Sequence, residues 1–195
     1  MLEQLPELWR AEVPGEAANV FLCDPATGSL FVGDGWGVAY AALRLHRLDL
    51  ATGRELAQVR TRHQAVSGMT LDAGRLYAAT GSRLFELDVT DLAVVRQWDK
   101  RLVRYTMQLV SIDSRLVAAN WLSPTIGIFD QATGQTRRLR VGSQPLIVRR
   151  DHEVIVIAGF DGGMWRLDEV GRLGAYTNTL PVAHATAGRH IWAIL

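Results

Sequence analysis

One motif recurs four times along this chain, and its spacing limits the folds that the chain can adopt. The four copies are LHRLDLATGREL (45–56), LFELDVTDLAVV (84–95), IGIFDQATGQTR (126–137) and MWRLDEVGRLGA (164–175). Each begins with an apolar strand-like run that ends in an aspartate, and the aspartates are Asp49, Asp88, Asp130 and Asp168. They are 39, 42 and 38 residues apart, and a period near forty is typical of stacked or circular repeat architectures.

Two further strand-like runs precede each copy of this motif. The nearer run is SLFVGDG (29–35), RLYAATG (75–81), RLVAANW (115–121) and VIVIAGF (154–160), and RHIWAIL (189–195) is a fifth copy of it. The repeat unit is thus four short strands joined by tight turns, with almost no helix. This pattern predicts an all-β fold, a β-propeller of four-stranded antiparallel blades, with complete blades at about 17–62, 63–104, 105–143 and 144–180.

The turn residues that recur in the repeat have a local physical reason. In Asp-x-x-Thr-Gly, the carboxylate can accept hydrogen bonds from backbone N–H groups two residues on, and glycine can adopt the positive φ that closes a hairpin. Asp49, Gly53, Asp130 and Gly134 are therefore expected to form turns rather than bind ligands. Asp88 with Asp91, and Asp168 with Gly171, are interpreted as degenerate copies of the same turn.

These residues resemble a known group of repeats. RLVAANWLSPTIGIFDQATGQTRRLRVGSQP (115–145) is similar to the YVTN-type β-propeller repeat, and LHRLDLATGREL is similar to the related quinoprotein-like (WD40-like) propeller repeats. The resemblance is good in the third blade and partial in the second and fourth. It implies architecture more than activity, because such propellers include amine and alcohol dehydrogenases, lactonases and non-catalytic binding modules.

The end of the chain leaves two arrangements open. A fifth blade starts at Pro181 and stops after its second strand, so the prediction is four complete blades plus a partial fifth in one domain, 1–195. Since bare strand edges promote aggregation, ELWRAEV (7–13) could pair beside 191–195 and close a five-bladed ring. Alternatively, the chain is part of a larger propeller that another chain, a second copy or further sequence of the same protein completes.

Composition narrows the class of partner. The 21 basic and 20 acidic residues give a net charge of +1, so no global field favours nucleic acid, and the short basic groups at 100–104 and 137–140 fall in different blades. Cys23 is the only cysteine, and the N-terminus lacks the basic start of a signal peptide. No apolar run is long enough to span a membrane. We therefore expect a cytoplasmic protein without membrane contact, for which nucleic-acid binding is a weak third choice.

A candidate binding face follows from the strand order. In each blade, the loop between the second and third strands lies on the same side as the connection to the next blade, and we call this side the loop face. The loops assigned to it gather aromatic and basic groups that are common in protein interfaces. The candidate partner-binding residues are Trp36, Arg62, His63, Arg101, Arg104, Tyr105, Trp121, Phe160 and Asp161.

Catalytic and metal-binding patterns are weak by comparison. On the expected innermost strands only His184 has the chemistry of a metal ligand, and a lone histidine favours a structural role. No nucleophile elbow or phosphate-binding loop is found, so no cofactor, metal or catalytic residue is predicted. The first hypothesis is a non-enzymatic β-propeller that binds a protein or peptide through the loop face. The alternative is a lactonase-like or quinoprotein-dehydrogenase-like enzyme, or a subunit of one.

Overall fold

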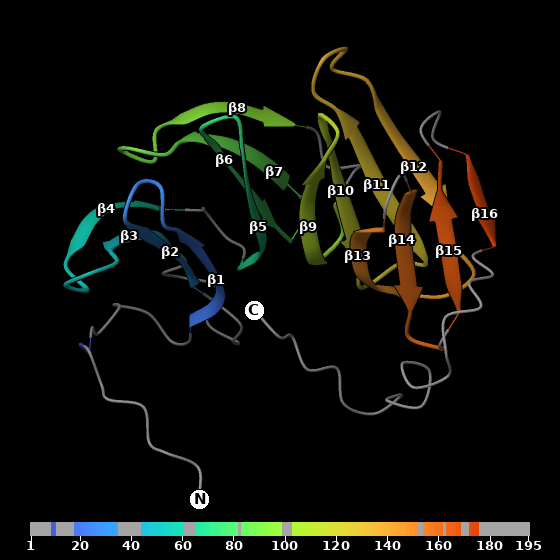
Figure 1. Cartoon of the computed structure of the whole chain (residues 1–195), viewed down its shortest axis with the longest axis horizontal. Coiled ribbons are helices and arrows are strands. Elements are labelled where there is room, and N and C mark those ends of the chain that lie inside the picture. The colour runs from blue at the N-terminus through green and yellow to red at the C-terminus, as the bar shows by residue number, and fades with distance from the viewer. Residues whose placement is uncertain are drawn as a thin grey trace, which may run out of the picture.

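The computed structural model contains four antiparallel β-sheets that follow one another along an arc (Figure 1). It describes residues 9–10, 18–34, 44–60, 65–81, 83–98, 103–151, 154–161, 163–168 and 172–175. Over these ranges the chain forms strands and turns without helix, and so no helix there is able to cross a membrane. The all-β prediction is confirmed.

Each sheet is one blade, and its four strands are hydrogen-bonded in chain order. The first blade is β1 (Ala18–Asp24), β2 (Ser29–Asp34), β3 (Arg44–Asp49) and β4 (Glu55–Arg60). The second is β5 (Val66–Asp72), β6 (Arg75–Thr80), β7 (Arg83–Asp88) and β8 (Val94–Trp98). The third is β9 (Thr106–Ile112), β10 (Arg115–Asn120), β11 (Thr125–Asp130) and β12 (Thr136–Arg140). The fourth is β13 (Pro145–Asp151), β14 (Val154–Gly159), β15 (Met164–Leu167) and β16 (Leu173–Ala175).

The repeated aspartates form the turns that the sequence predicts. The Asp130 carboxylate accepts hydrogen bonds from the backbone N–H of Thr133 (2.8 Å) and from its hydroxyl (2.9 Å). The N–H of Gly134, whose φ is +70°, returns to the Asp130 carbonyl at 2.8 Å. Asp49, Thr52 and Gly53 repeat this geometry in the first blade. These aspartates therefore serve to close the β3–β4 and β11–β12 hairpins.

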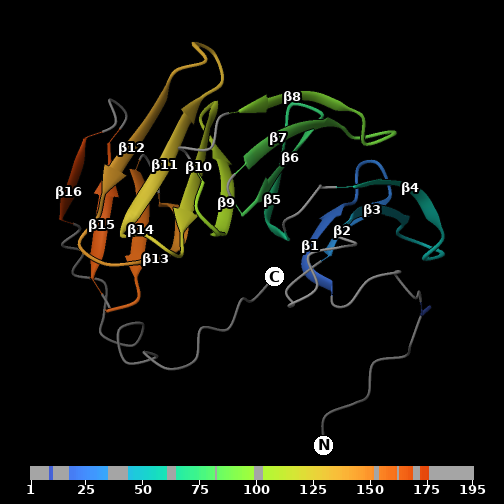
Figure 2. The same cartoon turned by 180° about the vertical axis from the view of Figure 1, so that it is seen from behind.

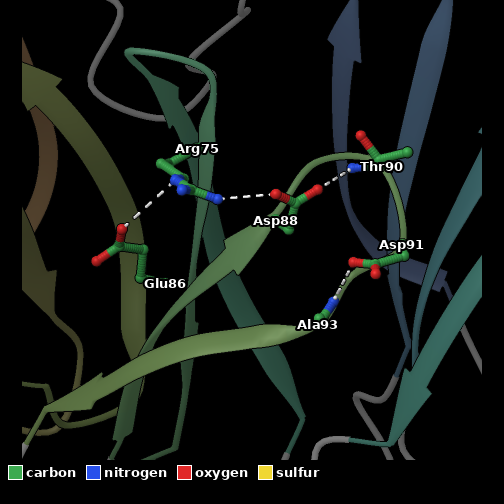
Figure 3. Close-up of polar contacts among 6 residues, drawn as sticks. All are labelled: Arg75, Glu86, Asp88, Thr90, Asp91 and Ala93. Carbon is green, nitrogen blue, oxygen red and sulfur yellow. Dashed lines mark hydrogen bonds and ion pairs between the residues drawn. The ribbon is translucent and has the colours of Figure 1, made fainter.

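The second blade closes its outer hairpin with a different set of side chains (Figure 3). The Asp88 carboxylate accepts from the N–H of Thr90 and from the Arg75 guanidinium, both at 2.8 Å, and Arg75 also lies 3.7 Å from Glu86. Asp91 accepts from the N–H of Ala93 at 2.9 Å. Leu92 takes the glycine position with a φ of +61° while its side chain is buried between the first two blades. The interpretation of Asp88 and Asp91 as a degenerate turn is confirmed.

Three apolar layers hold neighbouring blades together. Phe31 and Leu45 of the first blade pack against Leu76 and Leu87 of the second. The next layer joins the second and third blades through Trp98 and Phe129, whose ring centroids are 4.5 Å apart, and a further layer joins the third and fourth. The second and third sheets are therefore packed through apolar side chains on both faces, as a propeller blade requires.

The blades approach most closely through their first strands. β1 contacts β5, β5 contacts β9, and β9 contacts β13 on the inner side of the arc (Figures 1 and 2). The second strand β2 also comes close to β5, because a Cβ atom at Gly33 would stand 2.7 Å from the Cβ of Val66, and only glycine permits this approach. Among the described strands, the first and fourth blades share no comparable interface, and the arc is open between them.

The four complete blades agree with the predicted boundaries, and other predictions fall outside the described residues. The partial fifth blade from Pro181 is one of these, as are His184, Gly171 and most of the segment 7–13. Within that segment, the Trp9 indole N–H donates to the Leu50 carbonyl at 2.9 Å, and the ring covers Gly53. Trp9 therefore lies beside the β3–β4 turn of the first blade.

The turn aspartates should make stability depend on acid pH. Hydrogen bonds from Thr52 to Asp49, from Thr90 to Asp88 and from Thr133 to Asp130 lower the pKa of all three carboxyls in the folded chain. Their contribution is complete above the unfolded value of about 3.9 and is lost as the pH falls through it toward the folded pKa values. The free energy of unfolding, measured by urea titration, should fall over this range. In the double variant Asp49→Asn/Asp130→Asn, the free energy of unfolding should depend less on pH. An unchanged dependence on pH would contradict the role given to these two carboxylates.

Candidate interaction surface

The loop face carries five of the nine predicted binding residues within the described chain. Arg104 and Tyr105 lie on the connection from the second to the third blade, and Trp121 follows β10. Phe160 and Asp161 follow β14 in the fourth blade. The other four, Trp36, Arg62, His63 and Arg101, fall outside the described residues.

A pair of aromatic side chains, the half-buried Trp121 and the exposed Phe160, spans the third and fourth blades. The Trp121 and Phe160 rings meet edge to face, with centroids 6.2 Å apart and an interplanar angle of 78°. Phe160 is 66% exposed, and the neighbouring Leu122 is 58% exposed. Sequence reasoning missed Leu122, although its place beside Trp121 in NWLSPT was a signal. We call Trp121, Leu122 and Phe160 the apolar patch.

Backbone hydrogen bonds tie this patch to the second blade. The Trp121 N–H donates to the Tyr105 carbonyl at 2.9 Å, and the Tyr105 N–H donates to the Gly81 carbonyl at 2.8 Å. Tyr105 is half-buried with a φ of +50°, a left-handed conformation that is uncommon for a bulky residue. Because strained backbone persists only where its surroundings enforce it, the loop face is built to hold this connection in place.

Asn120 fixes the base of the same loop. Its side chain is completely buried, and its Oδ1 accepts from the Arg104 N–H at 2.9 Å and from the Thr106 hydroxyl at 3.4 Å. Its Nδ2 donates to the Thr125 hydroxyl, which lies 2.9 Å from the Ser123 hydroxyl. This network connects both sides of the 121–124 loop to the strand that precedes it. Sequence analysis placed Asn120 within the run RLVAANW (115–121) and assigned it no role.

Phe160 stands on a loop that is shaped by Trp165. The Trp165 ring covers Gly142, Gly159 and Gly163, where an added Cβ atom would stand 2.6 to 2.8 Å from ring carbons. The Phe160 N–H donates to the Gln144 carbonyl at 2.9 Å. The loop that carries Phe160 is thus packed against Trp165, while the Phe160 side chain itself is mostly exposed.

Asp161 braces this loop. Its carboxylate accepts from the Ser143 hydroxyl at 2.6 Å and from the Gly163 N–H at 2.9 Å. The Ser143 hydroxyl and then the Gly163 N–H lower the pKa of Asp161. With two donors already bound, this carboxylate links the 142–145 and 160–163 segments of the fourth blade.

The described residues offer little for small-molecule chemistry. No group of three histidine, cysteine or acidic side chains gathers there in an arrangement that could hold a metal ion. An apolar cavity of about 10 Å³ lies between the second and third blades, lined by Leu84, Val103, Leu109, Leu116, Ala118, Gly127 and Phe129. It has room for about one water molecule and therefore is too small for a substrate.

Comparison by sequence finds no relative, because no protein-family model matches the chain and no curated protein is detectably similar to it. Solved structures do share its fold. BamB from Moraxella catarrhalis, a β-propeller, is 18% identical with a TM-score of 0.63, and the match covers 85% of this chain and 51% of BamB. The computationally designed protein Ika8 is 14% identical with a TM-score of 0.68, and the match covers 85% of this chain and 50% of Ika8. The designed protein Ika4 is 15% identical with a TM-score of 0.64, and the match covers 89% of this chain and 100% of Ika4.

These likenesses establish the β-propeller fold and nothing beyond it, because all three identities are low. The chain spans about half the length of BamB and of Ika8, and the match to Ika4 covers the whole length of Ika4. The YVTN-type and quinoprotein-like classification of the repeat stays a prediction.

The buried amide of Asn120 provides a test of how the surface is supported. Asn120→Ala would leave the Arg104 N–H and the Thr106 hydroxyl without this acceptor, which should lower the free energy of unfolding by about 1–3 kcal/mol. Urea titration measures the loss. The exposed amide Gln97 is the matched control, and Gln97→Ala should change stability by less than about 0.5 kcal/mol. Equal effects of the two substitutions would show that the network does not hold the loop.

Proposed function

We propose that this β-propeller is a non-enzymatic interaction module whose loop face binds a protein or peptide. The observation that carries the proposal is the apolar patch, because Leu122 and Phe160 are more than half exposed although both sit on tightly held loops. Exposed aromatic anchors of this kind dominate binding energy in many protein interfaces. The proposal leaves out catalysis, since nothing in the described residues supplies a converging set of reactive groups.

The support beneath the patch favours binding without large rearrangement. Trp121 and Phe160 contact each other, and backbone hydrogen bonds fix the two loops that carry them. A patch held in advance loses little conformational entropy when a partner docks. The exposed Arg104 lies beside it in the chain connection and supports a partner with an apolar side chain flanked by an acidic group.

Two further assignments accompany this proposal. Cys23 is free and exposed, which supports a reducing compartment, so we propose a cytoplasmic location. The Asp-x-x-Thr-Gly turns of the first and third blades support placing the repeats in the YVTN-type group.

Substitution within the apolar patch tests the function. Proteins retained from a cell extract by the immobilised chain would be identified by mass spectrometry, and the affinity of the purified partner would be measured by calorimetry. Trp121→Ala and Phe160→Ala should each weaken binding by about thirtyfold, the loss of a hot-spot residue worth about 2 kcal/mol. Phe160→Ala should leave the thermal unfolding midpoint unchanged, because that side chain is mostly exposed.

The matched control lies on another part of the molecule. Val95 is also about half exposed but sits on β8, the outermost strand of the second blade, so Val95→Ser should bind as the unmodified chain does. If the patch variants keep full affinity, or if Val95→Ser loses affinity equally, the loop face is not the binding surface.

A further inference from the structure

The first blade exposes a side chain that every later blade buries. Phe21 lies opposite Val32 on β2, and the same register position is Met69 in the second blade, Leu109 in the third and Val148 in the fourth. Met69, Leu109 and Val148 each pack against the preceding blade and are at most 7% exposed. Phe21 is 61% exposed. An aromatic side chain thus stands at a blade-interface position without a described blade in front of it.

The fourth blade shows the complementary feature at the other end of the arc. Leu45, Leu84 and Ile126 each lie four residues before the turn aspartate, and each is buried against the following blade. The fourth copy of this position is Met164, which pairs with Ala158 as Ile126 pairs with Ala119. Met164 is 38% exposed. The arc therefore presents apolar side chains at both of its ends, in the register of a blade interface.

The first and fourth blades also share an arginine two residues before the turn aspartate, and this arginine can reach a following blade. Arg47 lies two residues before Asp49, and its guanidinium crosses to the next blade to donate to the Thr90 carbonyl at 2.8 Å. Thr90 is two residues after the turn aspartate Asp88. Arg166 holds the position of Arg47 in the fourth blade, and its side chain is exposed. The residue that corresponds to Thr90 in a first blade is Ala51.

We propose that a second copy of this chain completes the propeller, with the fourth blade of each copy packed against the first blade of the other. Phe21 would then be covered as Met69, Leu109 and Val148 are, Met164 would be covered as Ile126 is, and Arg166 would donate to the Ala51 carbonyl of the second copy. The two ends are complementary because they continue one repeat. A twofold axis makes two such head-to-tail interfaces at once and leaves no open end.

The structural comparisons support a second copy of this chain as the partner that covers both ends of the arc. The arc matches half of BamB and half of Ika8, so in those chains as much chain again lies beyond the matched part. A second arc of four blades supplies the same amount. Ika4, matched over its whole length, shows that an arc of this extent also exists as a separate chain.

The test measures the mass of the full chain in solution by size-exclusion chromatography with light scattering. The chain is expected to have twice its 21.6 kDa. Phe21→Glu and Met164→Glu each place a charge in both interfaces of the dimer, so each variant alone should have the mass of one chain. Val95→Glu, at an exposed position away from the blade interfaces, should remain a dimer. Thermal unfolding and far-UV circular dichroism confirm that each variant is folded.

Mixing the two variants tests the head-to-tail arrangement. One interface of the mixed pair joins an intact Phe21 to an intact Met164, and the other carries both charges. The mixture should therefore regain dimer that neither variant forms alone. Arg166→Ala, which removes no apolar contact, should weaken association measurably by sedimentation while leaving the fold unchanged.

Three results would overturn the proposal. A single-chain mass for the unmodified protein would mean that no second copy completes the ring, whether the ring is closed by the chain itself or stays open. A dimer that survives both glutamate substitutions would place the interface elsewhere. Failure of the mixed variants to associate would exclude the head-to-tail arrangement. None of these results bears on the apolar patch, whose substitutions are expected to leave the mass unchanged.

Discussion

Every part of this structure depends on the need of each four-stranded sheet to bury two apolar faces. A sheet with Phe31 and Leu45 on one face and Leu48 and Val32 on the other cannot be stable alone in water. Packing blade on blade satisfies one face at a time, and Gly33 on β2 lets β5 of the second blade come close enough to do so. The result is an arc whose curvature brings β1, β5, β9 and β13 to the inside, and whose stability is shared between neighbours.

The sequence predicted the strands and turns well because their determinants are local. The Asp49 and Asp130 carboxylates bind donors two or three residues away, so their hairpins can be recognised without tertiary information. Leu92 is different. It occupies a left-handed position that the motif assigns to glycine, and its burial in the layer between two blades accompanies that conformation. A tertiary contact of this kind has no signature within its own repeat.

The candidate surface was predictable in location but not in construction. Strand order places Trp121 and Phe160 on one face, and alternation along a strand cannot tell that their rings meet. The ring of Trp165 holds the Phe160 loop by covering three glycines that are up to 21 residues from one another in the chain. Asn120 acts through the Arg104 N–H, sixteen residues earlier. Such long-range contacts follow from the packing of blades, which the repeat pattern fixes only in outline.

The two sides of the arc differ in how strictly the repeat is kept, and this difference has a physical cause. On the side of the aspartate turns, the hairpin between the third and fourth strands must reverse within a few residues, so a change in its length would shift the register of the fourth strand. On the loop face the 2–3 connections begin after the strands have paired, and they vary from TGS in the second blade to NWLSPT in the third. Variation is tolerated there because the sheet beneath does not depend on it. The exposed apolar patch lies on this variable side, where a binding surface can change while the blades stay the same.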